Sequence, residues 1–550
     1  MTNNRPWVRK YDPEVPAALE YPETTIQDFL IQQAINYPKR SAIVYSDSSI
    51  TYEDLLIQAR RFANNLIRLG LKLGDRVGIC LPNIPQFVTA YYGILMAGGI
   101  VAAMNPAYPQ CELDFQAGIV KPRFLIGLEQ NGIVLSEITS KQQIDKLILL
   151  NRINETASGN NVVSGEKIFS FSRMLIDCNN VDGLPSINPD QPAVFQFSGG
   201  TTGIPKAAVG LHRNVAANVI QFKQWLTTMK DGEEIFLTAI PLYHVYGMVI
   251  GLNVGIAMGA TIVLVSDPRD LSGMLNQIQK YAVTFFPGVP SIYHAINQFP
   301  PVKNGEFDLR TIKACISGSA PLLQETRIQF EKLTGGKLVE GYGLSEAPTA
   351  THCNPINGEN RNGSIGLPLP DVDCKIVDLE DNSKELKIGE AGELLIRGPQ
   401  IMKEYYQQPD ETSLVLREGW LCTGDIAKMD KDGYFYIVGR RKELIKVNGL
   451  QVWPTEVEEV LIKHPSIKET AVAGIPDPAH GEIVKAWVVL NDSASIDLLE
   501  LQAHCRFSLA GYKIPKQFEI IDSLPKTFVG KVLRRELVQE HLEKIKKQGA

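Results

Sequence analysis

Short apolar runs rich in β-branched residues alternate with longer helical segments along much of this chain. Residues 76–82 (RVGICLP) and 99–106 (GIVAAMNP) are strand-like, and residues 85–98 (PQFVTAYYGILMAG) between them are helical. A strand–helix–strand succession predicts a parallel sheet with helices on its faces. Further strand-like runs occur at residues 260–267, 282–290 and 312–322. This alternation predicts an α/β fold.

Residues 51–70 carry the start and stop signals of one helix. Thr51 and Asp54 form a capping box, in which side chains satisfy the first free backbone N–H groups. Gly70 ends the segment. The apolar residues that share one face of this helix are Leu55, Leu56, Ala59, Phe62, Ala63 and Leu66.

The chain of 550 residues is too long for one hydrophobic core, so we expect two to four structural units. From residue 371 the pattern changes to short strands and turns. After about residue 443 it indicates a separate small α+β unit, in which a helix over residues 454–464 lies between short strands.

Charge and cysteine spacing limit the class of protein. The net charge is -6, from 55 basic and 61 acidic residues, which argues against a nucleic-acid partner. The first residues are polar and lack the apolar core of a signal peptide. The eight cysteines show no metal-ligand or redox spacing. We therefore predict a cytoplasmic protein with free thiols.

Residues 247–266 form an almost entirely apolar run. Gly247, Gly251, Gly255 and Gly259 are spaced by four, which would also suit a membrane dimerisation face. Glycines weaken a lone spanning helix, and polar segments flank the run closely. We therefore predict a buried helix, a turn and a strand, and we disfavour a membrane transporter. Loose attachment to a membrane stays open.

Residues 197–209 (FSGGTTGIPKAAV) place small residues and one lysine between two apolar runs. Without a Cβ, glycine lets backbone N–H groups approach an anion closely. The hydroxyls of Ser198, Thr201 and Thr202 add donors, and Lys206 adds a positive charge. A polyphosphate suits this arrangement, although the Walker A pattern is absent.

The segment FSGGTTGIPKAAV resembles the phosphate loop of the adenylate-forming superfamily, which includes acyl-CoA synthetases, luciferases and peptide-synthetase adenylation domains. Gly199 and Ala207 replace the serine and the glycine that are usual in this loop, and Glu404 in the segment QIMKEYYQQPDET replaces another usual glycine. The resemblance covers nearly the whole chain and is closest to bacterial medium- and long-chain fatty-acid–CoA ligases. Further segments resemble the family's motifs in the same order: PLYHVYG (241–247), SGSAPL (317–322), EGYGLSEAP (340–348), residues 420–449 and LPKTFVGKVLRREL (524–537).

The resemblance implies an architecture and a reaction. Residues 1–439 would form a large N-terminal domain of layered α/β subdomains with a small β-rich subdomain. Residues 440–443 would form a hinge, and residues 444–550 a small mobile α+β C-terminal domain. The implied cofactors are ATP, Mg²⁺ and CoA. A carboxylate and ATP would give an acyl-adenylate and pyrophosphate, and CoA would then give the thioester and AMP.

The resemblance also assigns residues to ATP and its metal ion. Thr201 and Glu346 would hold Mg²⁺, a hard cation that prefers oxygen ligands. Asp425 would bind the ribose hydroxyls, and Arg440 the ribose or phosphate. Ser345 keeps a hydroxyl where threonine is commoner. The phosphate-binding residues would be Ser198, Gly199, Gly200, Thr201, Thr202, Gly203 and Lys206, and the adenine segments Gly318, Ser319 and Ala320 with Glu340, Gly341, Tyr342 and Gly343.

Four residues of the C-terminal part would carry the chemistry and the domain movement. Lys531 would be the catalytic lysine, bridging the attacking carboxylate and the α-phosphate. Lys442 would be the hinge residue. Lys446 and Gly449 would line the channel of the CoA thiol after the domain has turned.

The acid pocket is assigned to His244, Gly247 and Gly318, and the two glycines are expected to leave room for an alkyl chain. His244 fits a packed core histidine as well. The YHVYG segment has no acidic residue to pair an amino group, which favours an apolar acid. We expect a medium- or long-chain fatty acid. The alternatives are an aryl or phenylpropenoic acid and, more remotely, a non-catalytic acyl- or nucleotide-binding paralogue. A homodimer stays open.

Overall fold

The computed structural model describes residues 5–151, 167–176, 183–198, 205–448, 450–477, 480–491, 496–527 and 530–548. The chain divides into two compact units. The large unit holds Met1–Asp373 and Arg397–Leu421, and the small unit holds Cys374–Ile396 and Cys422–Ala550. This division follows from the contacts within each unit. The predicted domain boundary after residue 439 and the predicted hinge at residues 440–443 concern rotation of the C-terminal domain, and both stay predictions.

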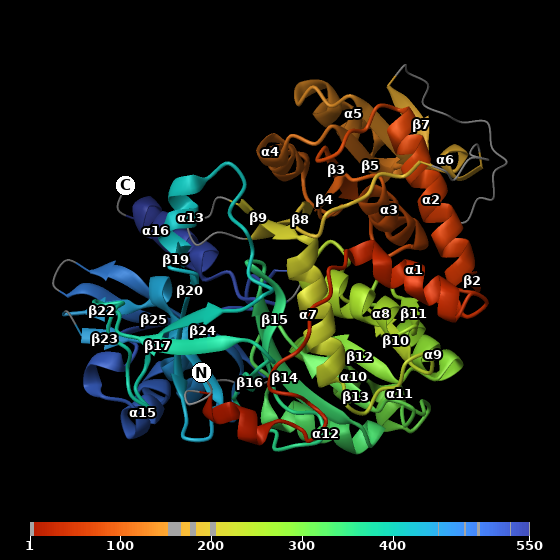
Figure 1. Cartoon of the computed structure of the whole chain (residues 1–550). Helices are drawn as coiled ribbons and strands as arrows, with labels where there is room; N and C mark the ends of the chain where they lie inside the picture. Colours follow the sequence, from red (N-terminus) through yellow and green to blue (C-terminus); the bar gives the residue numbers. More distant parts are fainter. Residues whose placement is uncertain are drawn as a thin grey trace. The chain divides into compact units, whose positions relative to one another are not determined.

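One sheet of the large unit has seven strands. Its core is parallel: Val77 of β3 pairs with Val101 of β4 on one side and with Phe124 of β5 on the other. Figure 1 shows helices α4 and α5 on one face of this sheet and α3 on the other. In sheet order the strands are β7 (Ile168–Ser170), β6 (Lys146–Leu150), β5 (Phe124–Leu128), β3 (Arg76–Cys80), β4 (Ile100–Ala103), β8 (Pro192–Ser198) and β9 (Lys206–Leu211).

The second sheet of the large unit has nine strands. Strands β11, β10, β12, β13 and β14 run parallel, and β15 returns antiparallel to β14. In sheet order the strands are β16 (Leu367–Pro368), β15 (Ala347–Cys353), β14 (Lys337–Leu344), β13 (Ala314–Ser317), β12 (Phe285–Gly288), β10 (Ile235–Thr238), β11 (Thr261–Leu264), β1 (Ser41–Tyr45) and β2 (Ser48–Thr51).

Helices cover both sheets of the large unit. The predicted helix is confirmed as α2, where the Thr51 hydroxyl accepts the Asp54 N–H at 3.1 Å, and its apolar face is buried. The helices are η1 (Pro6–Lys10), α1 (Ile26–Asn36), α2 (Tyr52–Arg68), α3 (Pro85–Met96), α4 (Gln110–Val120), η2 (Glu129–Asn131), α5 (Gly132–Lys141), α6 (Arg173–Ile176), α7 (His212–Trp225), η3 (Gly247–Val254), α8 (Gly255–Ala257), α9 (Leu271–Tyr281), α10 (Pro290–Gln298), α11 (Pro300–Lys303), α12 (Gln324–Thr334) and α13 (Pro409–Val415).

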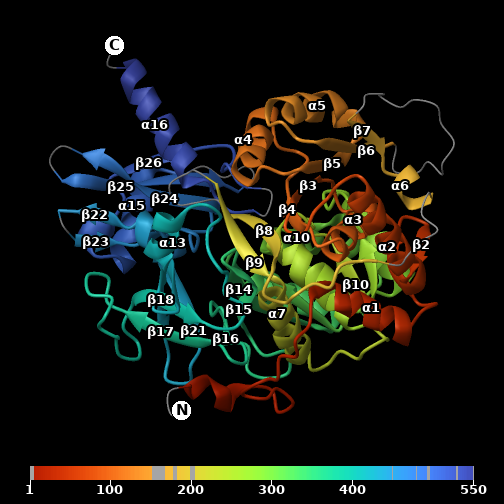
Figure 2. The same cartoon turned by 45° about the horizontal axis from the view of Figure 1, so that its top comes forward.

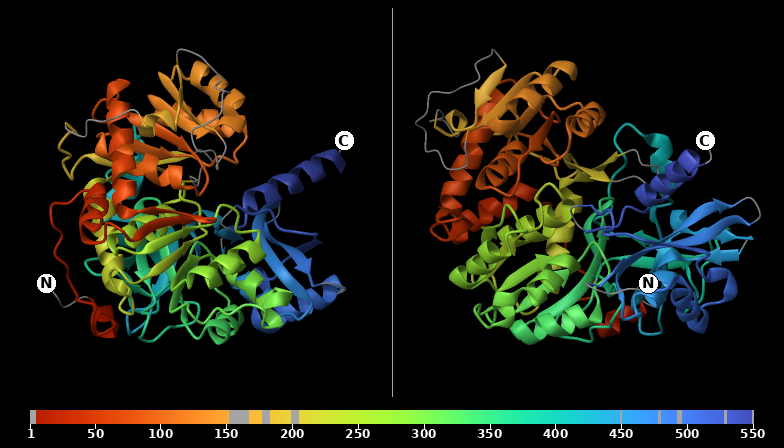
Figure 3. Two further views of the ribbon diagram at one scale, coloured as in Figure 1. Left: turned by 90° about the vertical axis from the view of Figure 1, so that its right-hand side faces the viewer. Right: turned by 180° about the vertical axis from the view of Figure 1, so that it is seen from behind.

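The small unit is built on two sheets, and its long antiparallel strands β24 and β25 are coloured blue in Figure 3. One sheet contains β17 (Asp373–Val377), β18 (Gly392–Arg397), β20 (Trp420–Met429) and β21 (Phe435–Arg440); β19 (Leu416–Arg417) pairs with Trp420 and Leu421 of the large unit. The other sheet contains β23 (Leu450–Val452), β22 (Ile445–Val447), β25 (Gly481–Leu490), β24 (Ile467–Asp477) and β26 (Gln517–Ile520). The helices are η4 (Arg441–Glu443), α14 (Pro454–Leu461), α15 (Leu498–Ser508), η5 (Gly511–Lys513) and α16 (Arg534–Gln548).

These elements confirm the predicted α/β fold with a large N-terminal part and a small α+β C-terminal part. The apolar run is also confirmed as a buried helix (η3 and α8), a turn at Gly259 (φ 66°) and strand β11. Among the helices of the described residues, none combines the length and the apolar character needed to cross a bilayer.

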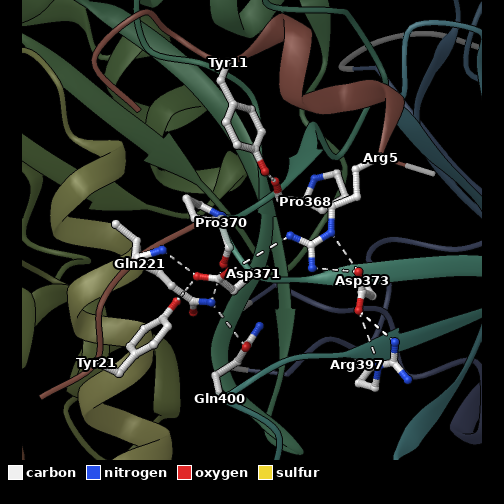
Figure 4. A network of polar contacts seen from close by, with 11 residues as sticks. Arg5, Tyr11, Tyr21, Gln221, Pro368, Pro370, Asp371, Asp373, Arg397 and Gln400 are labelled. Atoms are coloured by element: carbon white, nitrogen blue, oxygen red, sulfur yellow. Dashed lines mark hydrogen bonds and ion pairs between the residues drawn. The ribbon is translucent and has the colours of Figure 1, made fainter. Parts of the chain in front are cut away.

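Polar contacts hold the start of the chain to the rest of the large unit (Figure 4). The Arg5 guanidinium lies 2.7 Å from the carboxylate of Asp373, which also pairs with Arg397 at 3.0 Å. The Tyr21 hydroxyl donates to Asp371 at 2.8 Å. Asp373 and Arg397 are the residues at which the chain leaves and re-enters the large unit, so one ion pair joins the two crossing points.

Candidate active site

The predicted phosphate loop connects two strands that lie side by side, β8 and β9, drawn in yellow in Figure 2. The antiparallel register places Ser198 opposite Lys206 at the open end of this hairpin. Both residues are buried. The structure thus brings the two ends of the loop together. The loop residues Gly199, Gly200, Thr201, Thr202 and Gly203 lie outside the described residues.

The Lys206 ammonium contacts two side chains of a segment that follows in the sequence about 200 residues later. It forms an ion pair with Glu411 of α13, and it lies 5.1 Å from the centre of the Tyr405 ring. The Tyr405 hydroxyl donates a hydrogen bond of 2.6 Å to Oε1 of Glu346. Tyr405 therefore lies between the predicted phosphate-binding lysine and the predicted metal-binding carboxylate.

The two predicted adenine segments lie on neighbouring strands. In the parallel pair β13–β14, Ser317 is the partner of Glu340. Gly318, Ser319 and Ala320 directly follow Ser317, whereas Gly341, Tyr342 and Gly343 directly follow Glu340 within β14. Ser319 has a positive φ of 72°, as a sharp turn after β13 requires. The structure brings these segments together.

Glu340 is a buried carboxyl group in this region, with 8% of its surface exposed. Its Oε2 accepts the Leu322 N–H at 3.4 Å. Burial raises the pKa of Glu340 from 4.5 to about 8, and the Leu322 hydrogen bond lowers it by a smaller amount. The carboxyl group is therefore mainly protonated at neutral pH.

The turn between β14 and β15 carries Ser345 and Glu346. The Ser345 hydroxyl donates a long hydrogen bond of 3.5 Å to the Phe197 carbonyl of β8, so the turn lies beside the phosphate-loop hairpin. Before the turn, Gly343 is required by sterics, since a Cβ there would lie 1.5 Å from the Thr349 carbonyl oxygen.

The predicted acid-pocket segment packs against both neighbouring regions. The Gln196 amide of β8 donates to the Tyr243 carbonyl at 3.1 Å. The Tyr246 hydroxyl donates to the Ile316 carbonyl at 2.8 Å, and its ring would lie 3.1 Å from a Cβ at Gly318. His244 is partly buried, and burial lowers its pKa to about 4, so the ring is neutral at pH 7.

One expectation about this pocket is wrong. Gly247 does not leave room for an alkyl chain, because its free side is filled by backbone. A Cβ at this position would lie 2.2 Å from the carbonyl oxygen of Pro241 and 2.7 Å from that of Ile240. The glycine permits close packing of the chain instead. At Gly318 the nearest atoms belong to the Tyr246 side chain.

In the small unit, the predicted ribose-binding pair is formed. Asp425 of β20 and Arg440 of β21 are register partners, and their side chains form an ion pair of 2.8 Å. Asp425 is 3% exposed. The Thr423 hydroxyl accepts the Asp425 N–H at 3.1 Å, a local hydrogen bond within β20.

Lys531 follows Gly530 (φ 81°), and its backbone forms two hydrogen bonds with Thr527. Its side chain is exposed, but desolvation by the surrounding chain, followed by the charge of Arg440, lowers the pKa of Lys531. Three residues later, Arg534 opens α16 and pairs with Glu458 at 2.8 Å.

The other predicted residues of this unit lie around β22. Lys442 is exposed within the short helix η4. Lys446 is exposed on β22, and its backbone N–H donates to Glu482 at 2.7 Å. Gly449 lies outside the described residues.

Sequence reasoning missed Tyr405, Glu411 and Tyr246. Tyr246 stands within the PLYHVYG motif itself, so the motif contained the signal. Tyr405 and Glu411 lie in the segment QIMKEYYQQPDET, in which the resemblance singles out only Glu404. Glu404 has no positive φ, and Ala207 lies in the strand β9, so neither departure needs the conformational freedom of glycine.

The chain belongs to the family of AMP-binding enzymes. Residues 30–406 match the model of the AMP-binding enzyme family, and residues 456–531 match that of the AMP-binding enzyme C-terminal domain.

Similar proteins of this family are known. A long-chain-fatty-acid–CoA ligase of Bacillus subtilis (strain 168) is 39% identical over 561 residues, covering 99% of each chain. A 4-coumarate–CoA ligase of Vanilla planifolia is 32% identical over 507 residues, covering 90% of this chain and 88% of its own length. The solved structure of ATP-bound MatB from Rhodopseudomonas palustris matches with a TM-score of 0.84 and 27% identity, covering 94% of this chain and 99% of that one.

Proposed function

We propose that this protein is an AMP-forming fatty-acid–CoA ligase acting on medium- or long-chain acids. It activates the carboxylate with ATP to an acyl-adenylate and then transfers the acyl group to the thiol of CoA. The observation that carries this proposal is the convergence of Lys206 and Glu346 on Tyr405, because a lysine and a carboxylate beside a phosphate loop suit a magnesium triphosphate.

Adenylation requires two anions, the fatty carboxylate and the triphosphate, to approach each other. Lys206 offsets charge on the β- and γ-phosphates, with donors from Ser198 and the loop residues Gly199, Gly200, Thr201, Thr202 and Gly203. Lys531 supplies a second cation, between the carboxylate and the α-phosphate. Positioned charges of this kind are among the largest contributions to catalysis.

The nucleoside is held by the remaining assigned residues. The adenine packs on the segment Gly318–Ser319–Ala320 and on residues 340–343, and Ser345 adds a hydroxyl nearby. Asp425 accepts the ribose hydroxyls, and Arg440 supports the ribose or phosphate.

Magnesium fits the donor set of the site. Mg²⁺ is commonly bound through one or two carboxylates together with substrate phosphates and water. Glu346 offers such a carboxylate, and Thr201 offers a hydroxyl. When bound, the ion neutralises phosphate charge.

For the second step, the C-terminal part turns about Lys442 after pyrophosphate has left. Lys446 and Gly449 then line the path of the narrow pantetheine arm of CoA. The predicted domains, residues 1–439 and 444–550 with the hinge at 440–443, belong to this proposal.

The acid is a fatty acid, bound beside His244 and Gly318. Support comes from the apolar character of this segment and from the higher identity to a fatty-acid ligase than to the coumarate ligase. We further propose a cytoplasmic location. Sedimentation with membranes after lysis tests a loose membrane attachment, and the mass in solution tests a homodimer.

ATP–pyrophosphate exchange across a panel of acids, followed by addition of CoA and identification of the product, tests the proposal. We expect exchange that depends on Mg²⁺ and a fatty acid, and thioester only after CoA is added. Exchange with coumarate but not with fatty acids would favour the aryl alternative. No exchange with any acid would favour a non-catalytic paralogue.

A further inference from the structure

A short segment of the large unit, residues 402–415, contacts both charged side chains of the proposed phosphate site, Lys206 and Glu346. Its first part pairs with β9, the strand that begins with Lys206. The Val209 N–H donates to the Glu404 carbonyl at 2.9 Å, and the Tyr406 N–H donates to the Ala207 carbonyl at 2.8 Å. This main-chain pairing fixes Tyr405 beside Lys206.

Tyr405 contacts both groups with different parts of its side chain. Its hydroxyl donates to Glu346 at 2.6 Å, while its ring faces the Lys206 ammonium at 5.1 Å. The side chain is 6% exposed, so both interactions are shielded from water. A buried donor restricts the directions that the Glu346 carboxylate can take.

Glu411 is placed by a second link within the same segment. The Thr412 hydroxyl oxygen accepts the Tyr405 N–H at 2.9 Å, and the hydroxyl donates to the Gln408 carbonyl at 2.8 Å. These two bonds tie the first turn of α13 to Tyr405. From that turn, Glu411 reaches the Lys206 ammonium.

The Lys206–Glu411 pair has a clear physical reason. The Lys206 side chain is 8% exposed, and a buried ammonium is costly without a counter-anion. Glu411 supplies this anion, and its own side chain is 38% exposed, so it can return to water. A nucleotide phosphate placed at Lys206 satisfies the same ammonium and repels the carboxylate.

We propose that binding of magnesium ATP exchanges the partner of Lys206: a phosphate replaces Glu411, while Tyr405 keeps the Glu346 carboxylate directed toward the metal ion. Glu411 is thus an internal competitor of the nucleotide, and Tyr405 is a positioning residue. This inference rests on the proposed function for the roles of Lys206 and Glu346.

Calorimetric titration with magnesium ATP, without acid or CoA, tests the exchange. Glu411→Gln removes the competing charge, so we expect the Kd for magnesium ATP to fall roughly five- to tenfold. Asp410→Asn, the matched control, removes a neighbouring exposed charge of α13 and is expected to change the Kd by less than about twofold. Unchanged or weaker binding by Glu411→Gln, or equal tightening by both variants, would overturn the exchange.

Tyr405→Phe tests the positioning role, because it keeps the ring and removes only the hydroxyl. We expect the Mg²⁺ concentration for half-maximal ATP binding to rise roughly threefold or more, with the affinity for metal-free ATP unchanged. Tyr406→Phe, which removes a hydroxyl from a ring that packs against Phe195 with the ring centres 4.6 Å apart, is the control. Equal loss of affinity for ATP with and without Mg²⁺ would refute a role through Glu346.

The outcome also separates this inference from the proposed function. A wild-type protein that binds no magnesium ATP would overturn both. A wild-type protein that binds it and forms acyl-CoA, while Glu411→Gln binds no more tightly, would overturn only the exchange.

Discussion

Asp425 and Arg440 are direct partners across the antiparallel strands β20 and β21, and their side chains form an ion pair of 2.8 Å. The carboxylate is buried, whereas the guanidinium is 35% exposed. The orientation of the Asp425 side chain, for which we propose a role in ribose binding, is thus restrained by its neighbour across the sheet.

Asp425→Asn is expected to weaken ATP binding by roughly ten- to a hundredfold. The amide replaces the charged acceptor that we propose for the ribose hydroxyls, and it removes the Asp425–Arg440 ion pair. Titration with magnesium ATP measures the change, and the circular dichroism spectrum of the variant controls for folding. An unchanged Kd would remove Asp425 from the nucleotide site.

Lys531→Ala is expected to reduce ATP–pyrophosphate exchange by at least about a thousandfold, because the cation between the two anionic reactants is lost. Lys446→Ala is expected to leave the exchange within about twofold and to slow thioester formation. Exchange and single-turnover thioester formation are measured on the same preparations. Equal loss of both steps in both variants would contradict the assignment of two separate roles.

The buried carboxyl of Glu340 should make stability depend on pH. Its pKa is raised from 4.5 to about 8 in the folded protein, so between these values the folded state keeps a proton that the unfolded state releases. Stability therefore falls as pH rises from about 4.5 to about 8, by a few kcal/mol. The side chain of Glu340→Gln cannot ionise. The urea midpoint of this variant should therefore rise relative to the wild-type midpoint as the pH increases from 5 to 8.

The control for this comparison is Glu325→Gln on α12, which alters an exposed carboxylate. Its urea midpoint should follow the wild-type midpoint at every pH. If Glu340→Gln kept a constant offset from wild type across the range, the carboxyl would not carry a raised pKa.

Two glycines of the predicted acid pocket should respond differently to alanine. Gly247→Ala drives a Cβ against the Pro241 carbonyl and should destabilise the large unit by roughly 1–3 kcal/mol, seen as a lower melting temperature. Gly318→Ala meets a side chain, the Tyr246 ring at 3.1 Å, and not backbone, so it should cost less stability than Gly247→Ala. We expect it to shift acid preference toward shorter chains in the exchange assay. Unaltered preference would place Gly318 outside the pocket.

Much of the fold could be predicted because its signals are local. The run RVGICLP became β3 (Arg76–Cys80), and the capping pair Thr51–Asp54 began α2, since both depend on residues adjacent in sequence. The motifs singled out the two predicted adenine segments, and the register of β13 and β14 shows that they lie on neighbouring strands. Their role in binding adenine stays a prediction.

The remainder depends on tertiary contacts that no local pattern contains. Lys206 and Glu411 are 205 residues apart in sequence, and the pairing of the 402–406 segment with β9 had no signal of its own. Gly247 illustrates a second limit. A glycine in the sequence does not reveal whether the space beside it is open or filled by backbone.

The polar contacts of the N-terminal residues have a practical consequence for anyone who prepares this protein. Trp7 is 2% exposed, Tyr11 stacks edge-on against Trp225 at 5.1 Å, and Arg5 joins the Asp373–Arg397 pair. A shortened gene product that starts near residue 25 would uncover the Trp225 ring, remove the Tyr21 hydrogen bond to Asp371 and remove the Arg5 ion pair with Asp373. Expression clones should therefore retain these first residues, and a purification tag needs a spacer before Arg5.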